Sequence, residues 1–430
     1  MIAANIKRTF LLFWVCALPF FMMAQSHDHG DGHDHDHDDH AHAEADHSHG
    51  DHGEHGCACY EKSEDKAEEY DAASDAFHHI ADANAYHVFG EVYLPLPMML
   101  YAPDAGWNFM LASAFDYGHN HGNGKKAIDR YVLNHGEVMR VADSSFPMGE
   151  VDIDCITHGA EDSYSAMYKG QCYELEYKST LDGGLFGGGL TSFYDFSITK
   201  NVFTMLLVLI LMFVVFRAVA SAYQSREGQA PKGIQAIIEP MFLFIRDEVA
   251  IPFLGHNYER FLPFLMSIFF FILGLNLVGQ IPFFPGSANV TGSLAVTGAL
   301  ALITFVLVNI NGNKHYWQHI FWMPGVPIPA RILLAFIEFL SLFIKPLTLM
   351  LRLAANITAG HIVVFMFIAL IFIFGKAGEN MLGAGMGTVI AIPLTMFMMA
   401  IELVVAFVQA FVFTILAASY LGAAVEEAHH

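Results

Sequence analysis

Six polar residues recur at steps of three and four inside one apolar stretch, residues 332–374. They are Glu338, Ser341, Lys345, Thr348, Arg352 and Asn356. On an α-helix this spacing places all six within about 40° of one face. Ionisable groups surrounded by hydrocarbon are costly, and they usually serve transport or proton relay. The alternative is a buried ion pair that only holds helices together. It explains neither the number of polar groups nor the lack of an evident partner for Arg352.

A second polar row lies in the last apolar stretch, residues 388–424. Its members are Thr395, Glu402, Gln409 and Tyr420, and their spacing gives them a common helical face. The loop between the two stretches is short, so we expect the two helices to pair antiparallel. That pairing places Gln409 level with Arg352. It places Glu402 level with His361, roughly 10–14 Å nearer the exterior.

The pair of His361 and Glu402 could pass protons, because imidazole titrates near neutral pH and a neighbouring carboxylate tunes it. His361 lies on the opposite side of its helix from Arg352. A pathway that uses both residues therefore requires an aqueous vestibule that wraps behind the arginine.

Five apolar stretches are long enough to cross a bilayer, which takes about 20 helical residues. They are residues 203–220, 261–284, 290–310, 332–374 and 388–424. The fourth would be roughly 64 Å long as one helix, against a hydrocarbon core of about 30 Å. It must therefore tilt, bend at Pro346 or run partly along the membrane. Residues 232–250 mix apolar and charged side chains, which predicts a helix on the membrane surface.

The positions of lysine and arginine predict the orientation. Five of them lie at the end of the first span or between the first and second spans: Arg217, Arg226, Lys232, Arg246 and Arg260. Lys314 and Arg331 flank the next connection on the same side. Positive connections are usually cytoplasmic. We therefore expect a cytoplasmic C-terminus and an extracytoplasmic N-terminal region.

The N-terminal half has a different composition. The chain of 430 residues is 54% hydrophobic, yet it carries a formal net charge of −22 and 24 histidines, and the charges crowd into this half. No basic stripe appears, which argues against a nucleic-acid partner. Residues 1–24 have a basic start at Lys7 and Arg8, an apolar run and a small Ala24. They predict a cleaved signal peptide, with an uncleaved anchor helix as the alternative.

Residues 25–75 hold a His/Asp-rich tract that we expect to be disordered. Weak ligands for zinc, copper or nickel would be His27, His29, His33, His35 and His37. A solvated spacer whose charge varies with pH explains the same composition.

Short apolar runs at 91–101, 108–113 and 130–141 predict a small β-containing extracytoplasmic domain over residues 76–198. His119 and His121 lie in a Gly-rich loop, where a metal site is the less favoured interpretation. An oxidising compartment permits disulfides, and Cys155 with Cys172 is the first pairing to expect. Cys57 and Cys59 are left for a metal or for other partners. No function for this domain follows.

Residues 260–282, 337–364 and 400–421 resemble subunit a of F-type ATP synthases, and the similarity extends over residues 199–430. The resemblance implies an essential arginine at Arg352, with Asn356 and Gln409 near it and an acidic cytoplasmic position at Glu338. Many relatives carry Glu where this chain has His361, and His where it has Glu402. The family often has Asp in the second and third spans, where Asn276, Gln280 and Asn289 are the candidates here. A long His/Asp-rich N-terminus is not a general family feature.

The resemblance implies a stator subunit of the Fo sector, working in the bacterial inner membrane with a c-ring, b subunits and the rest of the synthase. We expect two offset half-channels for protons. The exterior one would use His361, Glu402, Asn276 and Gln280, and the cytoplasmic one the stripe from Glu338 to Thr348. The chain has no P-loop. Neither catalytic residues nor a cofactor is therefore expected, and ATP chemistry belongs to other subunits.

Three other functions are weaker. A zinc transporter with a His-rich sensor tail needs metal ligands clustered within the spans, which only His361 and Glu402 approach. A self-contained proton-coupled carrier would show inverted repeats, which are not evident. A structural anchor would not bury Arg352. The expected fold is therefore an all-α polytopic membrane protein with about five crossing helices, the last two long and tilted, and a surface helix. The disordered tract and the small β-containing domain precede it.

Overall fold

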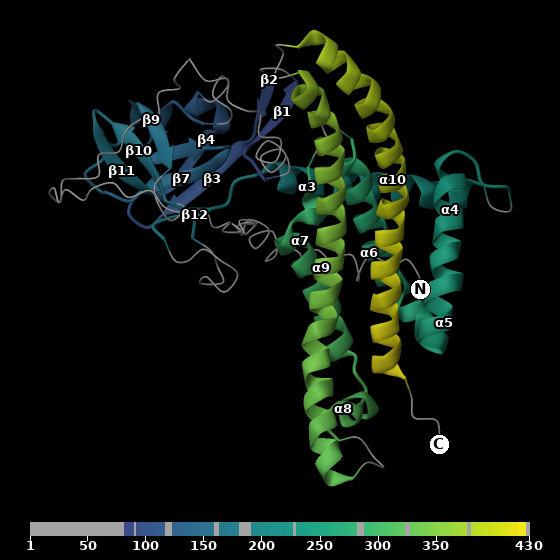
Figure 1. Ribbon diagram of the computed structural model, residues 1–430. Coiled ribbons are helices and arrows are strands. Elements are labelled where there is room, and N and C mark those ends of the chain that lie inside the picture. The colour runs from purple at the N-terminus through teal and green to yellow at the C-terminus, as the bar shows by residue number, and fades with distance from the viewer. Residues whose placement is uncertain are drawn as a thin grey trace, which may run out of the picture. The chain divides into compact units, whose positions relative to one another are not determined.

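A computed structural model describes residues 81–89, 92–116, 123–158, 163–179, 191–226, 229–281, 288–322, 327–375 and 380–426 (Figure 1). The described residues form two compact units. A β unit takes Pro97–Phe196, and a helical unit takes the residues before Pro97 and those from Ser197 onward. Several predictions lie outside the described residues. These concern the signal peptide, the His/Asp-rich tract with its candidate ligands, Cys57 and Cys59, and His119 and His121.

The β unit contains two antiparallel sheets, which confirms that a β-containing domain precedes the helices. The larger sheet has the strand order β8-β5-β6-β7-β11-β10-β9. Its strands are β5 (Lys126–Ile128), β6 (Tyr131–Asn134), β7 (Glu137–Val141), β8 (Glu150–Asp152), β9 (Cys155–His158), β10 (Tyr164–Tyr168) and β11 (Gln171–Glu176). The smaller sheet has the order β12-β3-β4, formed by β3 (Pro97–Ala102), β4 (Gly106–Leu111) and β12 (Tyr194–Asp195). A single 3₁₀ turn, η1 (Ala112–Phe115), follows β4.

Two tight hairpins set the register of the larger sheet. His135–Gly136 joins β6 to β7, and Lys169–Gly170 joins β10 to β11. All four residues have positive φ, between 47° and 82°. Two-residue turns of this kind match the right-handed twist of the strands they connect. Glycine occupies the second position of both turns, where a side chain would add strain.

A buried arginine organises the polar part of this unit. Arg140 is 1% exposed, and its guanidinium donates to both carboxylate oxygens of Asp104 at 2.7 Å. Arg130 adds a third bond to the same carboxylate at 3.2 Å. The hydrogen bond from Arg140 is the main cause that holds the pKa of Asp104 below its ordinary value. A cation this deeply buried is stable only while it is paired.

The strand register corrects one prediction about the disulfides. Cys155 and Cys172 are both disulfide-bonded. However, Cys155 on β9 and Cys172 on β11 face the same residue, Met167, from opposite sides of β10. Two strand spacings separate their Cα atoms by roughly 9–10 Å, whereas a disulfide allows at most about 7 Å. The expected pairing of Cys155 with Cys172 is therefore wrong, because a whole strand lies between them.

A small hairpin of the helical unit holds the start of the first long helix. The hairpin consists of β1 (Ala85–Phe89) and β2 (Val92–Pro95), and the helix is α3 (Lys200–Ser225). The Lys200 amide donates to the Ala83 carbonyl at 2.9 Å. The Tyr86 hydroxyl donates to the Lys200 carbonyl at 3.0 Å and also bonds the Thr204 hydroxyl. Burial is the largest cause that raises the pKa of Tyr86 to about 12. The hairpin thus satisfies backbone groups at the N-terminus of α3.

Ten further helical segments follow in the described residues, and their lengths range from 3 to 48 residues. They are α4 (Ile234–Ile245), η2 (Arg246–Ala250), α5 (Ile251–Leu254), η3 (Gly255–Asn257), α6 (Tyr258–Gly279), η4 (Val290–Gly292), α7 (Leu294–Ile310), α8 (Lys314–Phe321), α9 (Ile328–Gly375) and α10 (Met381–Val425). Four described stretches are long and apolar enough to cross a membrane: 200–225, 234–279, 330–375 and 381–425. A fifth is added if α7 and α8, bent by 105°, count as one span. A polytopic helical membrane protein is therefore confirmed.

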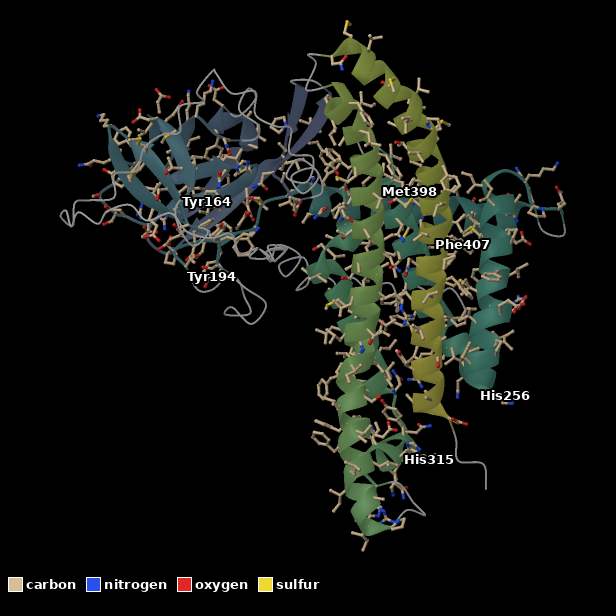
Figure 2. All side chains as sticks on the ribbon, viewed as in Figure 1. Tyr164, Tyr194, His256, His315, Met398 and Phe407 are labelled. Carbon is tan, nitrogen blue, oxygen red and sulfur yellow. The ribbon has the colours of Figure 1, made fainter. Side chains whose placement is uncertain are left out.

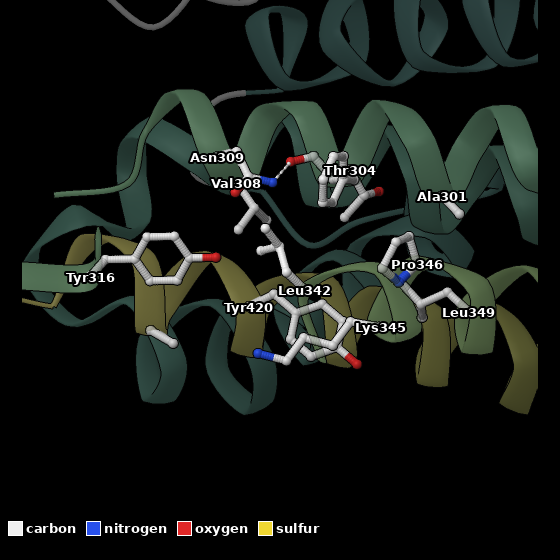
Figure 3. A pocket seen from close by; sticks show the side chains of 12 residues that line it. Ala301, Thr304, Val308, Asn309, Tyr316, Leu342, Lys345, Pro346, Leu349 and Tyr420 are labelled. Atoms are coloured by element: carbon white, nitrogen blue, oxygen red, sulfur yellow. Dashed lines mark hydrogen bonds between the residues drawn. The ribbon is translucent and has the colours of Figure 1, made fainter. Parts of the chain in front are cut away.

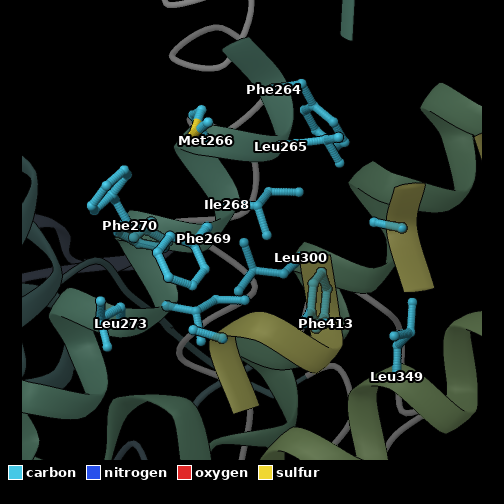
Figure 4. Packing of buried hydrophobic residues seen from close by; sticks show 14 of the residues in the cluster. Phe264, Leu265, Met266, Ile268, Phe269, Phe270, Leu273, Leu300, Leu349 and Phe413 are labelled. Carbon is cyan, nitrogen blue, oxygen red and sulfur yellow. The ribbon is translucent and has the colours of Figure 1, made fainter. Parts of the chain in front are cut away.

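Helix α6 forms the centre of the helical unit. Most of its residues are buried, whereas most residues of α9 and α10 are not. Its residues Ile268 and Phe269 are fully buried, and they pack with Leu300 of α7, Leu349 of α9 and Phe413 of α10 (Figure 4). The long helices α9 and α10 instead expose large apolar side chains, which suits contact with lipid or with another protein.

Helix α10 is held at several points along its length. Phe407, labelled in Figure 2, and Phe411 pack on Phe244 of α4, with ring centroids 6.3 and 5.2 Å apart. A Cβ on Gly422 would overlap the Phe253 carbonyl oxygen of α5. Asn313 donates from its backbone and its side chain to the last carbonyls of α10, Ala424 at 2.8 Å and Val425 at 2.9 Å. Residues 234–254, which include most of the stretch 232–250 expected to form a surface helix, thus run beside the C-terminal half of α10. Their depth in a membrane stays a prediction.

Candidate functional site

Helices α9 and α10 pair antiparallel, and close contacts fix which residues lie at the same level. Gly375 packs on Ala384, and Gly387 packs on the backbone of Leu370 and Ile371. Further along, a Cβ on Gly360 would overlap the Glu402 carboxyl oxygen. Near the C-terminus, the Lys345 ammonium lies 5.5 Å from the centre of the Tyr420 ring. Glu402 is thus level with Gly360 and His361, as the residue numbers predict.

Glu402 is the buried acid of the helical unit. Its side chain is 5% exposed, and its Oε1 atom has no hydrogen-bond partner among the described residues. Gln280 of α6 donates to the Glu402 backbone carbonyl at 2.7 Å. One turn away, Asn276 donates to the Ala406 carbonyl at 3.2 Å. These two bonds hold α6 against α10 beside the carboxyl group. A buried carboxyl oxygen without a partner is a place where a water molecule or a proton binds.

More amide and hydroxyl groups join this level from neighbouring elements. The Asn276 Oδ1 atom accepts a bond from the Thr291 hydroxyl at 2.7 Å, and Asn289 donates to the Thr358 hydroxyl at 3.1 Å. The Oδ1 atom of Asn289 is buried and has no partner within the described residues. The His361 Nε2 atom points toward α6, and it lies 3.9 Å from where a Cβ of Gly279 would be. We call Asn276, Gln280, Asn289, Thr291, Thr358, His361 and Glu402 the polar cluster.

Arg352 lies on the outer face of α9, outside the polar cluster. Its side chain is exposed, and among the described residues it makes neither a hydrogen bond nor an ion pair. Its electrostatic neighbour is Tyr420. On the same face of α9, one turn away on either side, lie the exposed Thr348 and Asn356, and exposed leucines such as Leu347 and Leu351 lie on the adjoining sides of the helix. A permanent cation in an apolar surface requires a charged or wet partner to cover it.

The structure divides the predicted polar stripe of α9 into two parts. Glu338, Ser341 and Lys345 are half-buried, whereas Thr348, Arg352 and Asn356 are exposed. The Thr348 hydroxyl donates back to the Ile344 carbonyl at 2.8 Å. Gln409 of α10 is 7% exposed, so it lies inside the unit while Asn356 lies outside. The first part therefore faces neighbouring helices, and the second part faces outward.

Lys345 helps to line a pocket beside the N-terminal half of α9. Helix α7 contributes Thr304 and Asn309, α8 contributes Tyr316, and α10 contributes Tyr420 (Figure 3). Asn309 donates to the Phe305 carbonyl at 2.7 Å, and its buried Oδ1 atom lacks a partner in the described part of the chain. The pocket is thus a mainly apolar space whose lining includes Lys345 and several uncharged polar groups.

Sequence patterns missed several of these polar neighbours. Thr291 and Thr358 in the polar cluster, and Thr304, Asn309 and Tyr316 in the pocket, were not predicted. The available signal was the presence of hydroxyl and amide side chains inside or beside otherwise apolar spans. Single threonines commonly bond their own helix backbone, as Thr304 also does with the Leu300 carbonyl at 3.0 Å. That signal is therefore weak.

Taken together, the fold and the site define a polytopic membrane protein. It has a buried acid–amide cluster in its helical core and a lone arginine on an outer apolar face. Residues 202–422 match the family model described as ATP synthase A chain. "ATP synthase subunit a" of Chloroherpeton thalassium is 36% identical over 244 residues, which cover 55% of this chain and 69% of the relative. "ATP synthase subunit a" of Myxococcus xanthus is 37% identical over 249 residues, covering 55% and 75%. The chain belongs to the family of ATP synthase subunit a.

A second match falls on the N-terminal region. Residues 76–163 match a family model described as a domain of unknown function, DUF8433. Among the described strands, β1 to β9 lie within this range. The match therefore covers the hairpin of the helical unit as well as most of the β unit.

Proposed function

We propose that this chain is the proton-translocating stator subunit of the Fo sector of a rotary ATP synthase. It couples proton flow to the rotation of a c-ring and thereby to ATP synthesis. The single observation that carries this proposal is Arg352, exposed and unpaired within the described residues, on the outer apolar face of α9. Membership of the subunit a family supports the same function. The chain is a transport subunit, and ATP chemistry belongs to other subunits.

The exterior half-channel ends at the polar cluster. Glu402 and His361 exchange protons there, and Asn276, Gln280 and Asn289 orient water beside them. The Oε1 atom of Glu402 and the Oδ1 atom of Asn289, which have no hydrogen-bond partner within the described residues, support this role because both are buried acceptors. A chain of water between such acceptors can relay protons. His361 faces α6 and not the outer face, so the vestibule lies behind Arg352.

The cytoplasmic half-channel uses the half-buried part of the stripe and the pocket around Lys345. Glu338, Ser341 and Lys345 line it, and exposed Thr348 lies where it reaches the outer face. The pocket between α7, α8, α9 and α10 supports this assignment. The two half-channels do not connect, so a proton must leave one, travel on the c-ring and enter the other.

Arg352 separates the two half-channels, with Asn356 and Gln409 close to its level. Its guanidinium stays protonated at any working pH. It attracts an ionised c-ring carboxylate, favours deprotonation of that carboxylate and repels a hydrated proton. The c-ring thereby supplies the partner that the outer face of α9 lacks. The b subunits and the remaining subunits complete the complex.

The chain acts in the bacterial inner membrane, with its C-terminus in the cytoplasm and its N-terminal region outside. Within it we assign residues 1–24 to a signal peptide, 25–75 to the His/Asp-rich segment, 76–198 to the extracytoplasmic domain and 199–430 to the membrane domain. Among the described residues, no group of three or more His, Cys, Asp and Glu could hold a metal ion. Membership of the subunit a family favours the proton-translocating role over a zinc transporter.

The test replaces Arg352 in the whole synthase. Arg352→Ala should abolish both ATP synthesis driven by a proton gradient and proton pumping driven by ATP, while the complex still assembles. The matched control is Arg331→Ala, which removes a guanidinium near the start of the same helix, where it stacks on Trp322 at 4.6 Å. Measured in inverted vesicles, synthesis retained by Arg352→Ala would refute the assigned role.

A further inference from the structure

One face of the smaller sheet of the β unit consists of apolar and aromatic residues. Residues paired directly across β12, β3 and β4 point to the same face. On this face lie Pro97, Met99, Tyr101, Trp107, Phe109, Leu111 and Tyr194, and Phe196 adjoins it. No member of this set is charged. We call it the aromatic face.

The opposite face of the same sheet is buried. Met98, Leu100 and Ala102 of β3 are at most 1% exposed. An antiparallel sheet with one buried face normally carries polar residues on the other. Here the outward residues of β4 are instead Trp107, Phe109 and Leu111, which are 54%, 69% and 50% exposed. An exposed, continuous apolar surface of this kind marks an interaction site.

The aromatic side chains form one continuous surface. The rings of Trp107 and Phe109 stack at 6.0 Å, with 16° between their planes. Trp107 also contacts Tyr101 at 5.0 Å and Phe196 at 5.4 Å. Tyr194, labelled in Figure 2, extends the surface onto β12. Tryptophan and tyrosine are enriched where a protein meets the polar–apolar boundary of a bilayer.

The chain connections limit how far this sheet can lie from a membrane. Only residues 196–199 separate the end of β12 from the start of α3. Four residues span at most about 14 Å, and one headgroup layer is about 5–8 Å thick. The other connection is shorter still, because β3 begins at Pro97, directly after Leu96. The Leu96 amide donates to Asn84 in the hairpin that holds α3.

We propose that the aromatic face docks on the bilayer, with its rings at the boundary between headgroups and acyl chains around the N-terminal end of α3. The face carries no charge, so docking depends on apolar contact and not on anionic lipid. The proposal rests on α3 crossing the membrane and does not depend on the route that protons take.

Fluorescence of Trp107 in the purified whole synthase tests the docking. Trp14, Trp317 and Trp322 are replaced by Phe in this chain, and the complex is placed in phosphatidylcholine vesicles whose lipids are brominated near the headgroup. The matched control is Trp107→Phe combined with Gln171→Trp, which moves the reporter to an exposed position on β11. Signals from other subunits are subtracted with a sample in which this chain has no tryptophan.

Brominated lipid should remove most of the Trp107 emission and leave that of the Gln171→Trp reporter unchanged. Adding Phe109→Ser and Leu111→Ser should restore the Trp107 emission, because these exposed positions weaken docking without opening the core. Equal quenching of both reporters would contradict the proposal. Trp107 emission that brominated lipid does not quench would also contradict the proposal. In that case, quenching by acrylamide would indicate a free surface, and the lack of quenching by acrylamide would indicate that protein covers the face.

Discussion

At the scale of single residues, the structure separates two kinds of polar group that the sequence places on neighbouring helices. The polar cluster around Glu402 is buried or half-buried and contains several hydrogen bonds, whereas Arg352 is exposed and lacks a bonded partner in the described chain. A proton relay needs buried acceptors that exchange protons with water, and an electrostatic barrier needs a fixed charge. The two groups therefore suit different steps.

The first prediction concerns the acid–imidazole pair. Glu402→Gln should lower ATP-driven proton pumping by roughly 10- to 100-fold, since a positioned acid or base typically contributes that much or more. Exchanging the two groups, His361→Glu with Glu402→His, should recover a large part of the activity because one acid and one imidazole are kept. Quenching of a pH-sensitive dye in inverted vesicles measures both. An exchange no better than Glu402→Gln would show that the pair does not act as a unit.

The second prediction concerns Gly360. A Cβ at this position would overlap the Glu402 carboxyl oxygen, so Gly360→Ala should displace the carboxyl group and slow proton transport severalfold. The matched control is Gly385→Ala on α10, where a Cβ meets nothing within 4 Å. Complex assembly, followed by native gel electrophoresis, should be normal for both. Unchanged transport in Gly360→Ala would mean that the placement of Glu402 is not critical.

At the scale of elements, the β unit depends on one ion pair. Arg140 is 1% exposed and bonds Asp104, whose side chain is 52% exposed. The pKa of Asp104 is held low chiefly by the hydrogen bond from Arg140. The stability from this pair is therefore present above the unfolded pKa, about 3.9, and is lost as pH falls through the lower folded pKa.

The third prediction follows from that pair. Asp104→Asn should destabilise the β unit by about 1–3 kcal/mol, because it leaves a buried guanidinium without its carboxylate. Solvent screening of the half-exposed carboxylate argues for the lower end. Asp152→Asn, a change on the exposed edge strand β8, is the control. The full chain is unfolded with denaturant in micelles, and cleavage of the β unit by a protease serves as the readout of its free energy of unfolding. The loss should shrink as pH falls below about 3.9, where the carboxyl group of the unfolded chain becomes protonated first, and it should disappear below the lower pKa of the folded state.

At the scale of the whole molecule, much of the membrane part could be predicted from the sequence. Apolar length located α3, α6, α7, α9 and α10, because hydrocarbon thickness imposes a length on every span. Residue numbers placed Glu402 beside His361, because a short loop forces antiparallel pairing. Contacts that involve a side chain from a third element could not be predicted. Thr291 and Thr358 bond Asn276 and Asn289, and no periodicity within one helix indicates such neighbours.

The cysteines show the same limit in the β unit. Their even number after signal removal and the oxidising compartment predicted disulfides, and Cys155 and Cys172 are indeed bonded. Their partners depend on strand order, which composition does not reveal. The insertion of β10 between β9 and β11 separates the two residues.

The fourth prediction addresses these disulfides. Mass spectrometry of the unreduced protein should find Cys155 and Cys172 each cross-linked to another cysteine, and no peptide pair in which the two are linked directly to each other. Reduction should release both. Cys155→Ser should leave the bond of Cys172 intact, whereas a direct link would free it. A Cys155–Cys172 peptide from protein kept below the pH of thiol exchange would contradict the strand register.

The bracing of α10 has a mechanical consequence. A stator subunit beside a turning rotor is pushed in the direction of rotation at every step. A stator helix that moved with the rotor would let the rotor turn without transmitting torque to the catalytic subunits. Helix α10 is fastened to α6 through residues 402 and 406, to α4 and α5 through Phe411 and Gly422, and to Asn313 at its end. In the proposed stator role, torque applied at its outer face would thereby be spread over several helices, and the recoil of any one of them would stay small.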